Sequence, residues 1–103
     1  MMKQREKKTL EEIKRVLKEN QTVLRERFKV KEMGVFGSYV RGEQKKRSDV
    51  DILVEFEEII SLLKLASLEN FLTDLIGVKV DVVPKEDIRP ELKERILEEV
   101  IPL

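Results

Sequence analysis

Two residue pairs near the middle of the chain could do chemistry together. The first is Gly37-Ser38, which follows the short apolar run Val35-Phe36. A glycine at the end of a strand lets the backbone turn sharply and lets a ligand approach it closely. Ser38 can cap a following helix, whose first N–H groups then face outward and suit a phosphate. The first pair therefore predicts an anion site.

The second pair is Asp49 and Asp51, which begins after ten intervening residues and leads into the apolar residues 52–54. Residues two apart on a strand point to the same side, so these carboxylates would lie next to each other. Two adjacent carboxylates are unfavourable unless a cation lies between them. Mg²⁺ suits them, since it takes one or two carboxylates and completes its shell with substrate phosphates. A phosphate site facing a magnesium site across one turn predicts a nucleotide site.

Asp81 is a third candidate, an acidic residue inside the β-branched stretch of residues 78–83. A charge there is costly without a partner. If the second and third strands are adjacent, Asp81 can reach the cation held by Asp49 and Asp51. Three carboxylates that share two metal ions stabilise both the attacking and the leaving oxygen in phosphoryl transfer.

Each motif alone has a plainer explanation. A Gly-Ser pair is commonly an ordinary turn, and alternate aspartates are commonly a solvated strand face. Asp81 alone could be an edge-strand charge that prevents aggregation. Their combination at this spacing favours the nucleotide site.

Three nearby residues leave two roles open. Arg41 either binds a phosphate as a bidentate donor or pairs with Asp49 or Asp51. Ser48 either contacts the nucleotide or only forms a hydrogen bond in the turn before the strand. Tyr39, the only tyrosine, either packs over the nucleotide or faces the core.

The composition limits the function classes. Lys+Arg and Asp+Glu both total 21, so no net charge attracts nucleic acid, and we expect no direct DNA binding. The run Lys45-Lys46-Arg47 is expected to be a solvated loop rather than a phosphate-steering patch. Cysteine and histidine are absent, which excludes disulfides and leaves acid–base chemistry to carboxylates, lysine, tyrosine or water. No apolar run approaches 18 residues and no signal peptide is evident, so we expect a cytoplasmic protein without a membrane span.

The elements that position these residues follow from periodicity. We expect one domain over residues 1–103, with helices at 9–29, 38–41, 61–76 and 88–100 and strands at 31–36, 48–56 and 78–83. The order α-β-α-β-α-β-α predicts a small α/β sandwich with a mixed three-stranded sheet and about four helices. Asn20-Gln21 is expected to weaken the first helix without ending it. The last helix is expected to bury one face, formed by Ile88, Leu92, Ile96 and Val100. The final residues 101–103 could dock on the domain or on a partner.

The spacing of Gly37-Ser38 and Asp49-x-Asp51 resembles the signature of the DNA polymerase β-like nucleotidyltransferase superfamily. The strings GSYVRG and SDVDILV are similar to its minimal nucleotidyltransferase (MNT) branch. The resemblance implies transfer of a nucleoside monophosphate from a nucleoside triphosphate. It implies that Gly37 and Ser38 hold the triphosphate, that Asp49 and Asp51 bind two Mg²⁺ ions, and that Asp81 binds the second ion and helps deprotonate the attacking hydroxyl. Neither a P-loop nor a G-x-G-x-x-G motif is present.

The same resemblance implies a partner, because MNT proteins are encoded beside HEPN ribonuclease toxins. It implies an antitoxin of a type VII-like pair that transfers AMP from ATP to a tyrosine hydroxyl of the toxin. Two alternatives remain open. One is a non-catalytic antitoxin that neutralises its partner by binding, and the other is a stand-alone small-molecule nucleotidyltransferase that dimerises.

Overall fold

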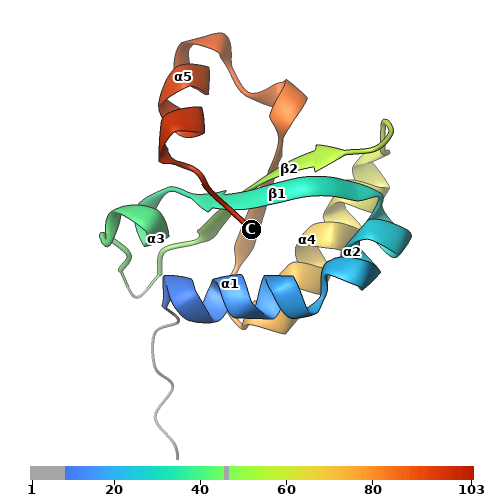
Figure 1. The fold of residues 1–103 in the computed structure, drawn as a ribbon, viewed down its shortest axis with the longest axis horizontal. Coiled ribbons are helices and arrows are strands. Elements are labelled where there is room, and N and C mark those ends of the chain that lie inside the picture. Colours follow the sequence, from blue (N-terminus) through green and yellow to red (C-terminus); the bar gives the residue numbers. More distant parts are fainter. Residues whose placement is uncertain (1–8, 46) are drawn as a thin grey trace, which may run out of the picture.

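The computed structural model describes residues 9–45 and 47–103 of the chain (Figure 1). Its helices are α1 (Leu10–Glu19), α2 (Gln21–Phe28), α3 (Ser38–Arg41), α4 (Leu62–Ile76) and α5 (Pro90–Glu99), with a short 3₁₀ turn, η1 (Lys85–Asp87). Its strands are β1 (Val30–Phe36), β2 (Val50–Phe56), β3 (Val80–Pro84) and β4 (Ile101–Pro102). None of the helices in this described part has the length and apolar character needed to cross a membrane.

The strands form one mixed sheet in the order β3-β2-β1-β4. β1 is antiparallel to both β2 and β4, while β2 is parallel to β3. The predicted α/β class and the adjacency of the second and third strands are confirmed. The sheet has one strand more than expected, because the last residues dock on the domain by pairing with β1, one of the two possibilities left open for them.

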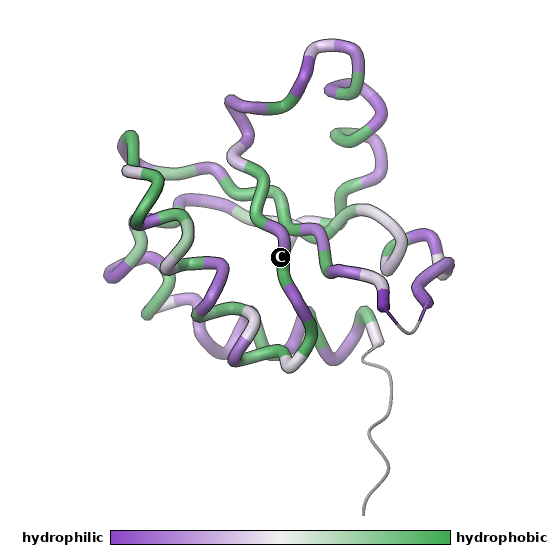
Figure 2. The backbone as a smooth tube through the Cα atoms, turned by 180° about the vertical axis from the view of Figure 1, so that it is seen from behind, coloured by the Kyte–Doolittle hydropathy of each residue, from purple (hydrophilic) through white to green (hydrophobic). Residues whose placement is uncertain are grey.

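The core lies between one face of the sheet and the helices α1, α2 and α4, which Figure 1 shows below the strands. Val35, Ile52 and Val54 point to this face and have no exposed surface. The apolar stripes of α1 and α4 meet them, which Figure 2 shows as green stretches on the strands and helices. Ser61 caps the start of α4 and Gly77 its end, close to the bounds of 61–76 expected from the sequence. The strand residues between the core positions therefore face the opposite side, where the site lies.

The prediction that one helix spans residues 9–29 is wrong, because Asn20 ends α1 and α2 begins at Gln21. Asn20 leaves the helical conformation at φ −112° and ψ 17°. Its side-chain Nδ2 donates to the Val16 carbonyl at 2.8 Å, so a side-chain bond competes with the helical ladder. Leu24 and Phe28 are still buried, because α2 packs against the same sheet.

The prediction that α5 buries one face is also wrong. No residue of α5 is fully buried, and Leu92 is 38% exposed. The helix lies on the face of the sheet opposite α1 and α4 (Figure 1), and Leu97 and Val100 line a cavity of about 300 Å³ together with residues of β1 and β2. Ile88, just before the helix, is the one residue of the expected set that is buried. α5 therefore covers the site face without forming a second core.

Candidate active site

Asp51 and Asp81 are direct neighbours across the parallel pair of β2 and β3. Parallel strands in register turn paired side chains to the same side, so both carboxylates face away from the α1 and α4 layer. Asp49 precedes β2 by one residue, and the period of two places it toward the same side. Its side chain is 44% exposed, and Lys79 Nζ lies 3.8 Å from its Oδ2. The structure thus brings the three predicted aspartates to one end of the sheet.

The edge strand β3 holds Asp81 in place through bonds that the sequence analysis missed. The N–H of Val80 donates to Thr73 Oγ1 at 3.0 Å, and the N–H of Val82 donates to Glu69 Oε2 at 2.8 Å. Both acceptors belong to the polar side of α4. Helix side chains therefore satisfy the outer edge of β3 on either side of Asp81, which fixes the strand and protects the edge from other chains.

Gly37 brings the first motif against the second. Its backbone, at φ 87° and ψ −156°, is in a region that essentially only glycine adopts. A Cβ built on Gly37 would overlap Asp51 Oδ2, so the turn passes directly over this carboxylate. The prediction that Ser38 caps α3 is wrong, because Gly37 occupies the cap position and no side chain caps the helix. The Ser38 hydroxyl has no hydrogen-bond partner among the described residues.

The electrostatics of the cluster are concentrated on Asp51. Burial first, and then the charges of Asp81 and Asp49, raise the pKa of Asp51 from 3.8 to about 6, against a lowering contribution from Arg41. Glu99 adds to the negative charge. Part of the Asp51 population is therefore protonated near neutral pH in the ligand-free protein.

Arg41 does not pair with the aspartates, which was one of the two roles left open for it. Its Nε donates to Glu43 Oε1 and its Nη1 donates to Glu99 Oε1, both at 2.9 Å, and it pairs with neither Asp49 nor Asp51. Glu99 also accepts the N–H of Gly37 at 2.6 Å through Oε2. Sequence reasoning missed Glu99, because it reads as one more charge on the polar face of α5.

The other residues singled out in the sequence have simple structural positions. Ser48 Oγ accepts the N–H of Lys45 at 2.7 Å, so it holds the turn before β2 in the ligand-free protein. Tyr39 is 4% exposed and packs in the core; burial, and then the charge of Asp49, raises the pKa of its hydroxyl. Lys45 and Arg47 are exposed in the loop, as expected, and Lys46 lies outside the described residues.

The three aspartates offer the hard oxygen ligands that Mg²⁺ takes in proteins. Burial and then the neighbouring charges of Asp81 and Asp49 raise the pKa of Asp51, and a divalent cation would offset both effects. Within residues 9–45 and 47–103, no group of three or more acidic side chains already converges as a formed metal site. The residues therefore fit a cation held by one or two carboxylates, with phosphate oxygens completing its shell.

Known proteins resemble this chain in sequence and in fold. A model of the nucleotidyltransferase domain family matches residues 10–103. The protein adenylyltransferase MntA of Thermococcus cleftensis is 55% identical over 93 residues, which cover 90% of this chain and 94% of that protein. The solved structure of a candidate minimal nucleotidyltransferase is 38% identical with a TM-score of 0.79, and the match covers 93% of this chain and 97% of that one.

A more distant structure shares the fold alone. It is a tri-AMPylated HEPN toxin of Shewanella oneidensis in complex with MNT antitoxin, matched at 19% identity and a TM-score of 0.66 over 87% of this chain and 70% of that chain. Because the family model matches residues 10–103, the chain belongs to the nucleotidyltransferase domain family. The solved minimal nucleotidyltransferase at 38% identity confirms the resemblance to the minimal branch.

Proposed function

We propose that this chain transfers AMP from ATP, in a Mg²⁺-dependent reaction, to a hydroxyl group of a HEPN-type toxin protein, and thereby acts as its antitoxin. The observation that carries the proposal is the register pair Asp51 and Asp81, with Asp49 beside it and the Gly37 turn directly over Asp51. A protein that only binds a partner gains nothing from three mutually repelling carboxylates.

Each residue has a distinct role in the proposed reaction. Gly37 and Ser38 contact the triphosphate, the Ser38 hydroxyl being a donor without a partner in the described chain. Arg41 lies on the next turn and supplies further N–H donors to the phosphates. Asp49, Asp51 and Asp81 provide the carboxylates for two Mg²⁺ ions. Ser48 shapes the turn that presents Asp49 and contacts the nucleotide from there.

The transfer itself makes and breaks one bond to phosphorus. The acceptor oxygen forms a bond to the α-phosphorus of ATP, while the bond from that phosphorus to the bridging oxygen breaks and pyrophosphate leaves with the electron pair. The hydroxyl proton passes to the carboxylate of Asp81, which is exposed on the edge strand. When bound, Mg²⁺ would neutralise the negative charge on the phosphate oxygens. Positioning and charge neutralisation supply most of the rate in such transfers, so the lack of histidine is no obstacle.

The acceptor must come from another molecule. Asp49 and Asp81 lie at the open end of the sheet, where an incoming side chain can approach them. The relative at 55% identity is named a protein adenylyltransferase, and the distant complex pairs an MNT antitoxin with an AMPylated HEPN toxin. Both support a protein hydroxyl as the acceptor, and we assign it to a tyrosine of the partner.

The test uses ATP labelled at the α-phosphate, Mg²⁺ and a purified HEPN-type toxin protein, the proposed partner. Asp49→Ala removes a proposed metal ligand, and Asp74→Ala is the matched control because Asp74 is an exposed aspartate on α4, away from the site. We expect label on the partner with the natural chain and with Asp74→Ala, and none with Asp49→Ala. A tyrosine-to-phenylalanine change in the partner should remove the label.

Two results would contradict the proposal and identify an alternative. If the partner is bound and inhibited by the natural chain and by Asp49→Ala, with no label in either case, the chain is a binding antitoxin. If label enters a small molecule without any partner protein, the chain is a stand-alone nucleotidyltransferase.

A further inference from the structure

Glu99 connects the last turn of α5 to the Gly-Ser turn, across 62 positions of the chain. β4 pairs Ile101 with Val35 and Pro102 with Gly34, so the antiparallel register, continued by two residues, places Glu99 opposite Gly37. One carboxylate oxygen accepts the N–H of Gly37 at 2.6 Å, and the other accepts Arg41 Nη1 at 2.9 Å. A single side chain thus holds the two ends of α3.

The segment that carries Glu99 is itself held closely against β1. A Cβ on Gly34 would lie 2.7 Å from Val100 Cγ2 and 2.8 Å from the Ile101 carbonyl oxygen, so only glycine lets the two backbones approach this far. The Glu99 side chain is 17% exposed. Its position is therefore set by the packing of β4 on β1 rather than by a flexible surface helix.

The contacts of Glu99 fix groups that would otherwise be free to move. Gly37 is a glycine with wide backbone freedom, and the Glu99 carboxylate accepts its one N–H donor and so fixes the direction of the turn. Arg41 has a long side chain, and fixing it beforehand reduces the entropy lost when it binds an anion. Burial disfavours the Glu99 carboxylate, but the bonds from Arg41 and Gly37 outweigh this and hold its pKa below the usual range.

These contacts leave donors available for a ligand. Arg41 uses Nε and Nη1 for Glu43 and Glu99, which leaves three of its five N–H donors. The Ser38 hydroxyl and N–H have no partner among the described residues. Glu99 therefore holds the turn in place without occupying all of its donors.

We propose that Glu99 is a positioning residue of the nucleotide site, which holds the Gly37 backbone and the Arg41 guanidinium in the arrangement that receives the triphosphate. This rests on the proposed function. It also means that the C-terminal segment is a structural part of the site and not merely a cover for the sheet.

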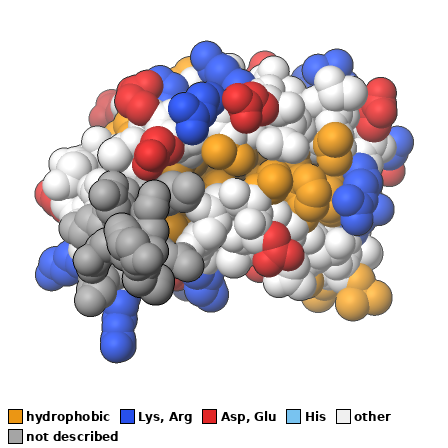
Figure 3. Space-filling model, turned by 90° about the horizontal axis from the view of Figure 1, so that it is seen from below, with side chains coloured by type: hydrophobic (Ala, Val, Ile, Leu, Met, Phe, Trp, Pro, Cys, Tyr) orange, Lys and Arg blue, Asp and Glu red, His pale blue; other side chains and the backbone are white. Residues whose placement is uncertain are grey.

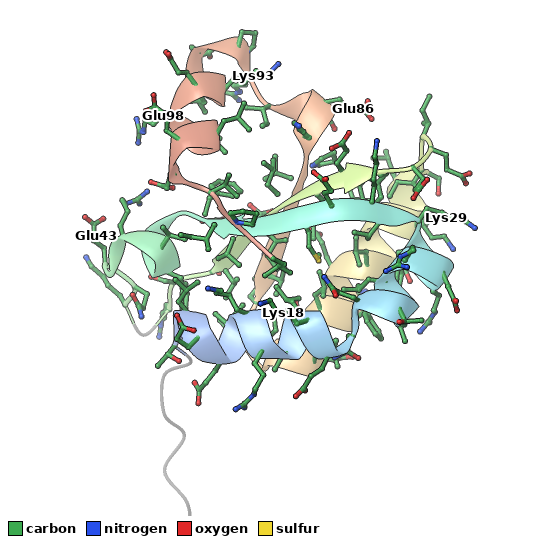
Figure 4. All side chains as sticks on the ribbon, in the orientation of Figure 1. Lys18, Lys29, Glu43, Glu86, Lys93 and Glu98 are labelled. Atoms are coloured by element: carbon green, nitrogen blue, oxygen red, sulfur yellow. The ribbon has the colours of Figure 1, made fainter. Side chains whose placement is uncertain are left out.

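The test compares Glu99→Gln with Glu98→Gln. Glutamine has nearly the same shape as glutamate, but it has one acceptor oxygen where the carboxylate has two. Its NH₂ group, which is a donor, must therefore face the N–H donor of either Gly37 or Arg41. Glu98 is the matched control because it projects outward from α5 (Figure 4) and is exposed. The probes are ATP with Mg²⁺ and inorganic tripolyphosphate with Mg²⁺, measured by calorimetry. We expect Glu99→Gln to weaken both by about tenfold, from the loss of charged hydrogen bonds, and Glu98→Gln to leave both unchanged.

A double-mutant cycle separates positioning from a general structural effect. If Glu99 acts through Arg41, Glu99→Gln should cost much less affinity when Arg41→Gln is already present. Glu99→Asp keeps the charge but shortens the reach, and it should weaken tripolyphosphate binding while thermal unfolding shows a folded protein. Unchanged or tighter binding by Glu99→Gln overturns the proposal, the tighter result showing that the carboxylate competes with phosphate. Failure of the natural chain to bind ATP would instead overturn the proposed function.

Discussion

Replacing Gly37 with alanine tests whether the Gly-Ser turn and the aspartate pair form one site. The alanine Cβ would overlap Asp51 Oδ2, and the backbone at φ 87° and ψ −156° is one that alanine rarely adopts. Gly42 provides the matched control. It also has a positive φ, of 73°, but a Cβ there meets nothing within 4 Å. Both variants carry a backbone penalty, which is larger at Gly37, and only Gly37→Ala adds an overlap with Asp51.

The structure allows the expected loss of unfolding free energy to be worked out for each variant. Gly42→Ala should lower the free energy of unfolding by about 1 kcal/mol, the cost of a left-handed backbone for alanine. Gly37→Ala should lower it by about 2–4 kcal/mol, since a less accessible backbone region is combined with an overlap. In a domain of this size each kcal/mol corresponds to a fall in Tm of about 4–8 °C. The assay is urea unfolding followed by circular dichroism, together with transfer of labelled AMP.

The two variants should differ more in AMP transfer than in stability. Gly37→Ala moves the Asp51 carboxylate, so it should abolish AMP transfer under conditions where most of the protein is still folded. Gly42→Ala should transfer AMP at a rate close to that of the natural chain. Equal losses of stability in the two variants, or an active Gly37→Ala protein, would refute the placement of the turn over Asp51.

Three further predictions follow from the same contacts. Because the folded-state pKa of Asp51, about 6, lies above its ordinary value of 3.8, the stability that this group contributes is full below about pH 4 and is lost as the pH rises through 6. Asp51→Asn should therefore flatten this dependence and raise the free energy of unfolding at pH 7 by about 1–2 kcal/mol, after allowance for solvent screening. Mg²⁺ should raise the Tm of the natural chain measurably more than that of Asp51→Asn, which a thermal shift assay can compare with Ca²⁺ and Na⁺ as control ions. Thr9→Ala should remove the capping box with Glu12, seen at 2.9 and 3.2 Å, and lower the free energy of unfolding by about 1 kcal/mol without changing AMP transfer.

The parts of the site that sequence could predict are those carried by local patterns. The positions of Asp49, Asp51 and Asp81 follow from the period of two and from strands that are consecutive in the sheet. The end of α3 at Gly42 and the cap of α4 at Ser61 follow from residue types alone. In each case neighbouring residues determine the result.

The parts that could not be predicted depend on distant segments. The break at Asn20 involves neither proline nor glycine and comes from a side-chain bond to Val16. The pairing of β4 with β1 has no local pattern, because Ile101 and Pro102 form a strand only against Val35 and Gly34. Glu99 reaches Gly37 only through that pairing, so no reading of the α5 periodicity could assign it.

The surface explains why specificity must come from the site and its partner rather than from overall charge. Positive and negative side chains are mixed over the face seen in Figure 3, with hydrophobic side chains between them, as the equal totals of 21 imply. Long-range attraction of a polyanion is therefore weak. In the proposed function, recognition of ATP would therefore depend on short-range donors such as Ser38 and Arg41 and on the local carboxylates.

Because the three carboxylates lie close together, a cation or nucleotide bound to them should increase the stability of the folded state. Asp49, Asp51 and Asp81 lie on a sheet face that α5 covers only loosely, and burial, followed by the charges of Asp81 and Asp49, raises the pKa of Asp51. A cation between them removes the repulsion, and a triphosphate adds partners for Ser38 and Arg41. Because ligands that bind only the folded state stabilise it by mass action, nucleotide with Mg²⁺ should strengthen this end of the sheet most. The end of the domain that holds the site is thus also the end whose stability depends on occupancy.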